Sequence, residues 1–206
     1  MIPPYAWFFE VPGYPDVRVK GVTDEQRAKN LANFQMIGRL AQEYGVDLNI
    51  GLWTQLPAKV VFDGISYGES LVENLPPGEA GGDYAAKGLR KLLEVCPGVA
   101  GVQLRMNLES GIPHAKQESY YQNLFTAVAS AGRPVKLDLR YKDLHQTTID
   151  LAVKAGLEVN VSTKFWCEHM GLPFHPTAQD PAYSPSRYGY GTMLRKPCLL
   201  YTSPSP

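Results

Sequence analysis

Four segments in which polar and apolar residues alternate constrain the fold of this chain most strongly. They span residues 47–55, 102–109, 135–140 and 158–166, and a helical pattern precedes each of them. Side chains alternate across a strand, so each segment predicts a strand with one apolar and one polar face. Helices between the strands imply parallel pairing, and parallel sheets are normally covered on both faces. We therefore expect the polar face to point into an enclosed space, as inside a (β/α) barrel that opens at the C-terminal strand ends.

The helical patterns span residues 24–44, 83–95, 117–130 and 144–155. Thr23 followed by Gln26 is a capping-box pattern, and Asp83 is expected to cap the second helix. Glycines directly after three of the helices predict where they stop. An apolar stripe on the first helix is expected to be buried; it comprises Leu31, Phe34, Ile37, Leu40, Ala41 and Tyr44.

Length and the end of the chain indicate an incomplete barrel. The chain has 206 residues, whereas a complete eightfold barrel needs about 250 residues. Residues 198–206 (CLLYTSPSP) resemble the translation of a sequencing adapter. The interpretation is an α/β fold, a partial (truncated) (β/α)8 TIM barrel. Residues 1–197 then form a single incomplete barrel domain, and residues 198–206 an artefactual tail.

Composition narrows the classes of partner. Lys plus Arg and Asp plus Glu number 20 each, so no basic field favours nucleic acid. No apolar run approaches the roughly 18 residues of a membrane span. Aromatic residues make up 11% of the chain, including 12 tyrosines, which suits a protein that stacks on sugar faces. Cys96 and Cys167 lack metal-ligand spacing, and no cofactor is expected. The N-terminus carries no signal-peptide pattern, and the compartment stays open.

Glu109 is the strongest candidate for chemistry. It follows Arg105 and Asn107 on the polar face, at the C-terminal end of the second predicted strand. A carboxylate there suits a general acid or nucleophile acting on a bond between sugars, with Arg105 and Asn107 holding substrate hydroxyls. The alternative is an Arg105–Glu109 ion pair that merely fills the barrel mouth.

Asp138 and Arg140 occupy the corresponding place on the third predicted strand. Asp138 is a candidate for the partner carboxylate, and Arg140 for substrate binding. Alternatively, Asp138 orients Arg140 or Lys136, and the Lys-x-Asp-x-Arg ladder neutralises itself inside the barrel.

Further candidates lie at the ends of the first and fourth strands. On the fourth, Lys164 is placed to bind a carboxylate or hydroxyl, Trp166 to stack on a sugar, and Glu168 or His169 to transfer a proton. Trp53 and Gln55 are expected to line the mouth of the first strand, with plain core packing as the alternative for Trp53. Lys164 also allows a Schiff-base interpretation, which requires a lowered pKa. The two histidines in this region lack a third ligand, so no metal site is expected.

The segments RMNLESG, VKLDLR and STKFWCEHMGLPFHPT resemble an uncharacterised group of bacterial glycoside hydrolase-like (β/α)8 barrels, broadly similar to the α-glucuronidase type. The resemblance covers roughly residues 45–197. It implies that acidic residues at strand ends carry catalysis, which falls on Glu109, with Asp138 and Glu168 as secondary carboxylates.

The favoured function is therefore hydrolysis of a glycosidic bond by paired-carboxylate acid/base chemistry, on a carbohydrate that includes an acidic sugar. Two alternatives remain open at this point. One is a Schiff-base lyase or aldolase that uses Lys164, and the other is a non-catalytic sugar-binding barrel.

Overall fold

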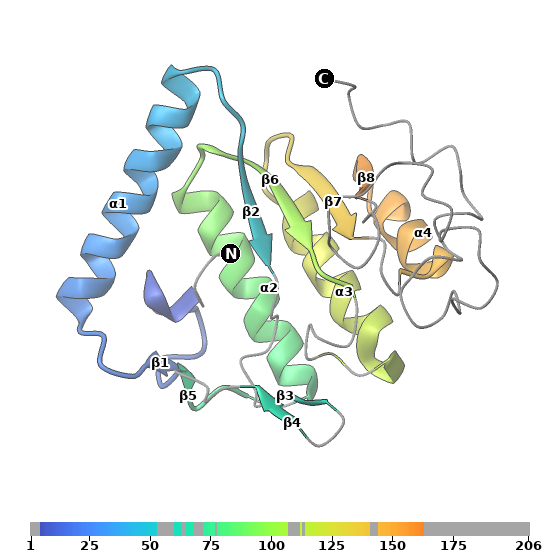
Figure 1. Ribbon diagram of the computed structural model, residues 1–206, viewed down its shortest axis with the longest axis horizontal. Helices are drawn as coiled ribbons and strands as arrows, with labels where there is room; N and C mark the ends of the chain where they lie inside the picture. The colour runs from blue at the N-terminus through green and yellow to red at the C-terminus, as the bar shows by residue number, and fades with distance from the viewer. Residues whose placement is uncertain are drawn as a thin grey trace, which may run out of the picture.

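The four alternating segments form one parallel sheet, and their apolar residues lie on the same face of it. In the computed structural model the strands lie in the order β2 (Leu48–Leu52), β6 (Val99–Leu104), β7 (Lys136–Arg140) and β8 (Val159–Ser162), and all neighbours are parallel (Figure 1). The structure describes residues 5–52, 60–62, 65–67, 72–76, 78–106, 112, 114–140 and 144–162. Within these ranges the predicted alternation of helices with parallel strands is confirmed.

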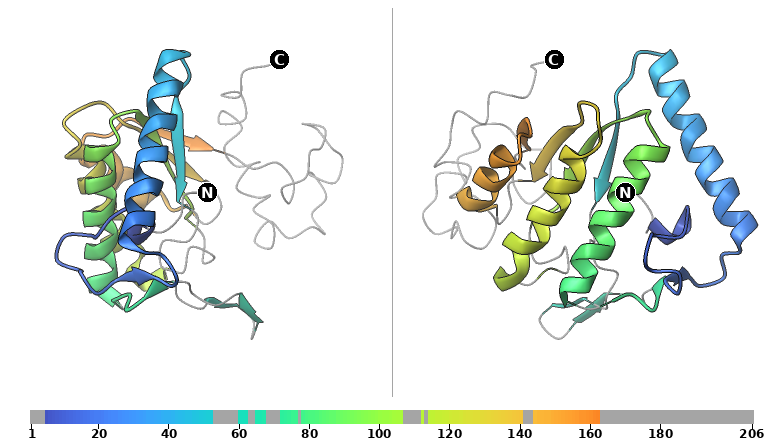
Figure 2. Two further views of the ribbon diagram at one scale, coloured as in Figure 1. Left: turned by 90° about the vertical axis from the view of Figure 1, so that its left-hand side faces the viewer. Right: turned by 180° about the vertical axis from the view of Figure 1, so that it is seen from behind.

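The helices connect successive strands and lie on one side of the sheet. They are α1 (Asp24–Glu43), α2 (Gly78–Val95), α3 (His114–Ala129) and α4 (Gln146–Lys154). Figure 2 shows α2, α3 and α4 over the same face of the sheet, with α1 beside the edge strand β2. No helix of the described part of the chain is long and apolar enough to cross a membrane.

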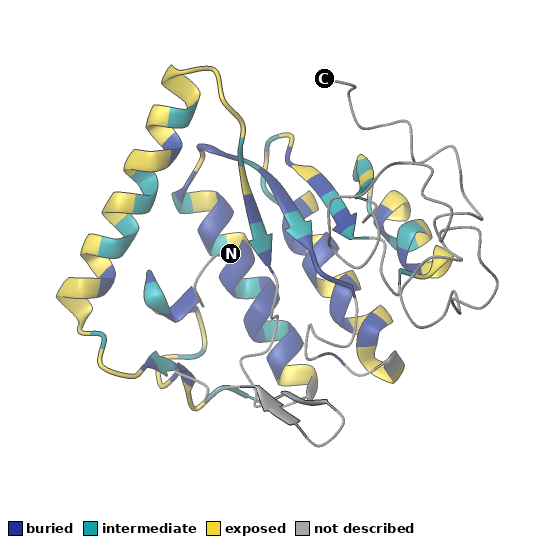
Figure 3. Ribbon diagram, viewed as in Figure 1, coloured by how far each residue is buried: buried dark blue, intermediate teal, exposed yellow. Residues whose placement is uncertain are grey.

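The core lies between the sheet and the helices α2 and α3 (Figure 3). Leu104, Leu137 and Leu139 of the sheet are fully buried, as are Tyr121 and Phe125 of α3. The predicted inner residues of α2 are buried as well; they are Leu89, Leu92 and Leu93. Each such side chain contributes about 1.5–3 kcal/mol of transfer free energy, so this layer holds the sheet and helices together.

The polar face of the sheet differs from the expectation of an enclosed interior. Among the described residues no helix covers it, and Asn49, Lys136 and Asn160 are exposed. No described strand extends the sheet beyond β2 or β8, so a closed barrel is not present in this part of the chain. A barrel closes only when its strand number, tilt and stagger agree, and four strands leave the sheet open.

The remaining elements are short. The 3-10 helix η1 (Tyr5–Trp7) and the strand β1 (Arg18–Val19) precede α1. β1 pairs antiparallel with β5 (Val72–Glu73). β3 (Val60–Phe62) and β4 (Ile65–Tyr67) form a separate antiparallel pair.

The predicted cap at Thr23 and the predicted glycine stops after α1, α3 and α4 are confirmed. The Thr23 hydroxyl accepts a hydrogen bond from the Gln26 N–H at 3.2 Å, as an N-cap does. Gly45, Gly132 and Gly156 follow α1, α3 and α4 with φ of 68°, 69° and 81°, the left-handed conformation of a helix stop.

The prediction that Asp83 caps the second helix is wrong. α2 begins five residues earlier, at Gly78, directly after two prolines, and Glu79 stands in its first turn. Asp83 belongs to the interior of α2. Its carboxylate lies 2.7 Å from Lys87 Nζ and accepts a hydrogen bond of 2.7 Å from the Tyr14 hydroxyl. These contacts lower the pKa of Asp83. An Asp followed four residues later by Lys stabilises the interior of a helix as well as its start, which explains the error.

The predicted burial of the α1 stripe is also wrong over its C-terminal half. Ile37, Leu40 and Tyr44 are 48%, 43% and 77% exposed. α1 instead turns Gly38 inward, where its backbone meets Gly98 in the turn between α2 and β6. Two glycines allow a close approach that larger residues would prevent, and this approach decides which side of α1 is buried.

Arg133, in the turn between α3 and β7, ties that turn to the end of α2. Its guanidinium donates hydrogen bonds to the carbonyls of Val99, Leu93 and Cys96 at 2.6, 3.3 and 3.4 Å. Carbonyls at a helix C-terminus lack intrahelical partners and carry partial negative charge. The cation therefore satisfies the end of α2 and fixes the start of β6.

The contact between Gly38 and Gly98 yields a stability prediction. A Cβ on residue 98 would lie 2.6 Å from the Gly38 carbonyl carbon, whereas a Cβ on residue 38 would lie 3.3 Å from Gly98 Cα. We expect Gly98→Ala to lower the free energy of unfolding by about 1–3 kcal/mol. Gly38→Ala should lower it less, because alanine recovers about 1 kcal/mol of helix propensity.

Urea denaturation of the two variants and the wild type measures this difference. A Gly98→Ala chain as stable as the wild type would show that the backbones are not in close contact.

Candidate functional site

One row of residues crosses the polar face through all four strands. The register places Gly51 of β2 beside Gln103 of β6, Gln103 beside Asp138 of β7, and Asp138 beside Asn160 of β8. This row exists because alternation puts every second residue of each strand on the same face. An amide, a carboxylate and a second amide therefore stand side by side, next to a position without a side chain.

Asp138 is the centre of a hydrogen-bond network that joins three strands. Its Oδ2 accepts from Gln103 Nε2 at 2.6 Å and from the Ser162 hydroxyl. Its Oδ1 accepts from the Ser162 N–H at 3.0 Å. Both carboxylate oxygens are engaged, so the side chain is held in one orientation.

A hollow of about 380 Å³ lies over this row. Its lining consists of Asn49, Ile50, Gly51, Val102, Gln103, Lys136, Asp138 and Asn160. A Cβ on residue 51 would meet no atom within 4 Å. The missing side chain of Gly51 therefore leaves space beside Gln103 and Asp138.

A second row borders the hollow toward the N-terminal strand ends. Lys136 Nζ lies 2.6 Å from Asp47 Oδ2, and this hydrogen bond and charge raise the pKa of Lys136. Among the described residues Asp138 forms no ion pair with Lys136 or Arg140. Lys136 is thus neutralised by Asp47 rather than by Asp138, which differs from the self-neutralising ladder considered from the sequence.

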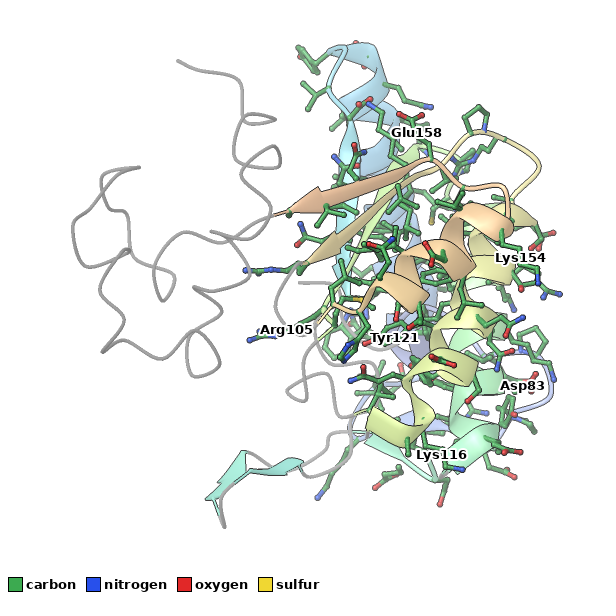
Figure 4. All side chains as sticks on the ribbon, turned by 90° about the vertical axis from the view of Figure 1, so that its right-hand side faces the viewer. Asp83, Arg105, Lys116, Tyr121, Lys154 and Glu158 are labelled. Carbon is green, nitrogen blue, oxygen red and sulfur yellow. The ribbon has the colours of Figure 1, made fainter. Side chains whose placement is uncertain are left out.

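Two guanidinium groups stand toward the C-terminal strand ends. Arg105 directly follows β6 and is 6% exposed, and Arg140 ends β7 and is half-buried. The Tyr121 hydroxyl donates to the Arg105 carbonyl at 2.7 Å, and Figure 4 shows the two residues at the same end of the sheet. Burial, and then the charge of Arg140, lower the pKa of Arg105 to about 10. Arg105 therefore remains cationic at neutral pH and favours an anion nearby.

Three of the predicted site residues lie in the described part of the chain, and they lie close together. Arg105, Asp138 and Arg140 all belong to the adjacent strands β6 and β7 or directly follow them. The other predicted site residues fall outside the described residues; they are Trp53, Gln55, Asn107, Glu109, Lys164, Trp166, Glu168 and His169. The described residues contain no group of three or more His, Cys, Asp or Glu side chains able to hold a metal ion.

Four residues of the row and of the network around Asp138 were not among the predicted site residues. Gln103 and Ser162 hold Asp138, while Gly51 and Asn160 continue the row. The signal that identifies them is present in the sequence, since all four stand on the alternating polar face. None of the four side chains is an acid, a base or a cation, so residue type alone does not mark them as candidates for catalysis.

The network around Asp138 gives a second prediction. Asp138→Ala should lower the free energy of unfolding by about 1–3 kcal/mol, because it leaves the half-buried Gln103 and Ser162 without their acceptor. Asp138→Asn should lower it less, since a turned Gln103 amide can accept from the new amide. Chemical denaturation of both variants measures the difference, and equal stability of Asp138→Ala and wild type would contradict the network.

Comparison with known proteins returns little. No protein-family model matches the sequence, and no curated protein matches it at a significant level. A solved structure, the GH20 β-N-acetylhexosaminidase from Streptomyces coelicolor A3(2), is similar with a TM-score of 0.40 and 14% sequence identity. The match covers 84% of this chain, which spans about 40% of the length of that enzyme.

Proposed function

We propose that this chain is part of a (β/α)8 barrel and that its polar face binds a carbohydrate whose glycosidic bond the complete barrel hydrolyses. The observation that carries the proposal is the row of hydrogen-bonding side chains from four parallel strands over a hollow of about 380 Å³. Sugar hydroxyls both donate and accept hydrogen bonds, and the amides of Asn49, Gln103 and Asn160 do the same.

The barrel part of the proposal rests on the arrangement of layers. Helices α2, α3 and α4 cover one face of a parallel sheet, and the polar residues occupy the other (Figure 2). In a (β/α)8 barrel the helices form the outer ring, and the C-terminal ends of the strands carry the site. The open outer edges of β2 and β8 are where further strands would pair.

Within this proposal the carboxylates have different roles. Glu109 is the acid or nucleophile, and Glu168 is a second carboxylate of the reaction. Asp138 positions Gln103 and Ser162, because both of its oxygens already accept hydrogen bonds from these residues. A general acid must instead present an oxygen to the leaving group.

The charge at the C-terminal strand ends supports an acidic sugar. Arg105 directly follows β6, and Arg140 ends the adjacent strand β7, so two guanidinium groups stand at this end of the sheet. Arg105 is buried and Arg140 is half-buried. Guanidinium groups bind carboxylates through paired hydrogen bonds. A uronic acid would present its carboxylate to them while its hydroxyls meet the amides of the row.

The hollow beside Gly51 allows a direct test of binding. A Cβ on residue 51 meets no atom within 4 Å, so Gly51→Val projects an apolar side chain into the hollow and adds a residue that favours strands. We expect the unfolding midpoint of this variant to equal that of the wild type. Its dissociation constant for D-glucuronate, measured by titration calorimetry, should be about tenfold higher or more. Glu73→Val, at an exposed position of β5 that does not line the hollow, is the control and should bind as the wild type does.

Unchanged binding by Gly51→Val would show that the sugar site is elsewhere. If D-glucose bound as tightly as D-glucuronate, the sugar site would stand but the proposed role of the two arginines would be contradicted.

The hydrolytic step is tested at Glu109 in the complete barrel. Glu109→Gln keeps the shape of the side chain and removes its acid, so turnover of an aryl uronide should fall by about 100-fold or more. The thermal midpoint should stay unchanged. Near wild-type turnover would refute the assignment of Glu109, and sugar binding without any turnover in the wild type would make the protein a sugar-binding barrel.

A further inference from the structure

The outer surface of α1 carries an exposed apolar patch. Met36, Ile37, Leu40 and Tyr44 are 46%, 48%, 43% and 77% exposed, and Val46 directly after the helix is 60% exposed. These five are all but one of the large apolar side chains that stand exposed in the described part of the chain; the other is Val153 of α4. We call the five residues the α1 patch.

The α1 patch lies on one side of the helix and at the margin of the molecule. Met36, Leu40 and Tyr44 are spaced by four residues, which places them above one another along one stripe. Figure 1 shows α1 at the side of the fold, and Figure 3 shows exposed residues along its outer surface. The inward side of the helix is occupied by its contact with Gly98, so the patch cannot turn into the core.

We propose that the α1 patch binds the same patch of a second copy of this chain, with the two α1 helices antiparallel. The stripe is symmetric about Leu40, because Met36 and Tyr44 stand four residues to either side. A twofold axis at Leu40 therefore packs Leu40 on its own copy and sets Met36 of one chain against Tyr44 of the other. A twofold interface must be self-complementary in this way.

The charges beside the stripe fit the same arrangement. Arg39 and Glu43 are exposed on one flank of the stripe, and neither forms an ion pair with a described residue. In an antiparallel pair about Leu40, Glu43 of one chain lies beside Arg39 of the other. In a parallel twofold pair this flank would instead face the opposite flank of the partner helix, so the two charges would not meet.

The exposed apolar area supplies a large part of what an interface needs. The five side chains leave on the order of 500 Å² of largely apolar surface per chain, against about 800 Å² that each partner contributes to a standard interface. The flanking polar residues of the helix supply the rim. The α1 patch is separate from the polar face of the sheet, so the inference goes beyond the proposed sugar site and does not depend on it.

Sedimentation of the full chain over a range of concentrations tests the proposal. The wild type should show a monomer–dimer equilibrium, and Leu40→Glu should raise the dimer dissociation constant by about tenfold or more. Val153→Glu places the same charge on an exposed apolar residue of another helix and should leave the dimer intact. A wild type that stays monomeric, or an association that Leu40→Glu does not weaken, would overturn the proposal.

Charge reversal tests the antiparallel geometry. Arg39→Glu and Glu43→Arg should each weaken the dimer, and the double variant should restore it. In a Cys167→Ser, Cys198→Ser background, Leu40→Cys should form a disulfide with its own copy, because it lies at the twofold axis. Failure of the double variant to recover, together with no Leu40→Cys disulfide, would refute the antiparallel α1 pair and indicate association through the open sheet edges.

Discussion

The contact between the apolar face of the sheet and the helices α2 and α3 excludes water from the core of the described chain. Leu104, Leu137 and Leu139 lie on this face, and Tyr121 and Phe125 pack over it from α3. Strand side chains alternate, so a slip of one residue would turn these leucines to the surface. The packing of the apolar face therefore also fixes which residues form the polar row.

The polar row is organised by hydrogen bonds rather than by burial. Asp138 joins β7 to β6 through Gln103 and to β8 through Ser162, while Lys136 is held by Asp47. Asp138, Gln103, Ser162 and Lys136 thus each have a hydrogen-bond partner. The space beside Gly51 is consequently the place where a ligand can approach without breaking an existing contact.

Local patterns predicted the fold well, and long-range contacts account for the errors. The period of two identified β2, β6, β7 and β8, and glycines 45, 132 and 156 marked three helix ends. The prediction of a cap at Asp83 was wrong because an acidic residue four positions before Lys87 stabilises the interior of a helix as well as its start. The exposed half of α1 depends on the approach of Gly38 to Gly98, which no local pattern encodes. At the site, alternation placed Gln103 and Ser162 on the correct face, but their roles arise from a hydrogen-bonded partner on another strand.

The position of Arg133 has a consequence for how the chain unfolds. Its guanidinium binds carbonyls of Leu93, Cys96 and Val99, which lie some 40 residues earlier, and bridges the turn after α3 to the junction of α2 and β6. Opening either region alone would break the hydrogen bonds of this half-buried cation to three carbonyls. The end of α2, β6 and the turn into β7 should therefore form one cooperative unit, whose amide protons exchange together, while α4 and β8 open independently at lower free energy.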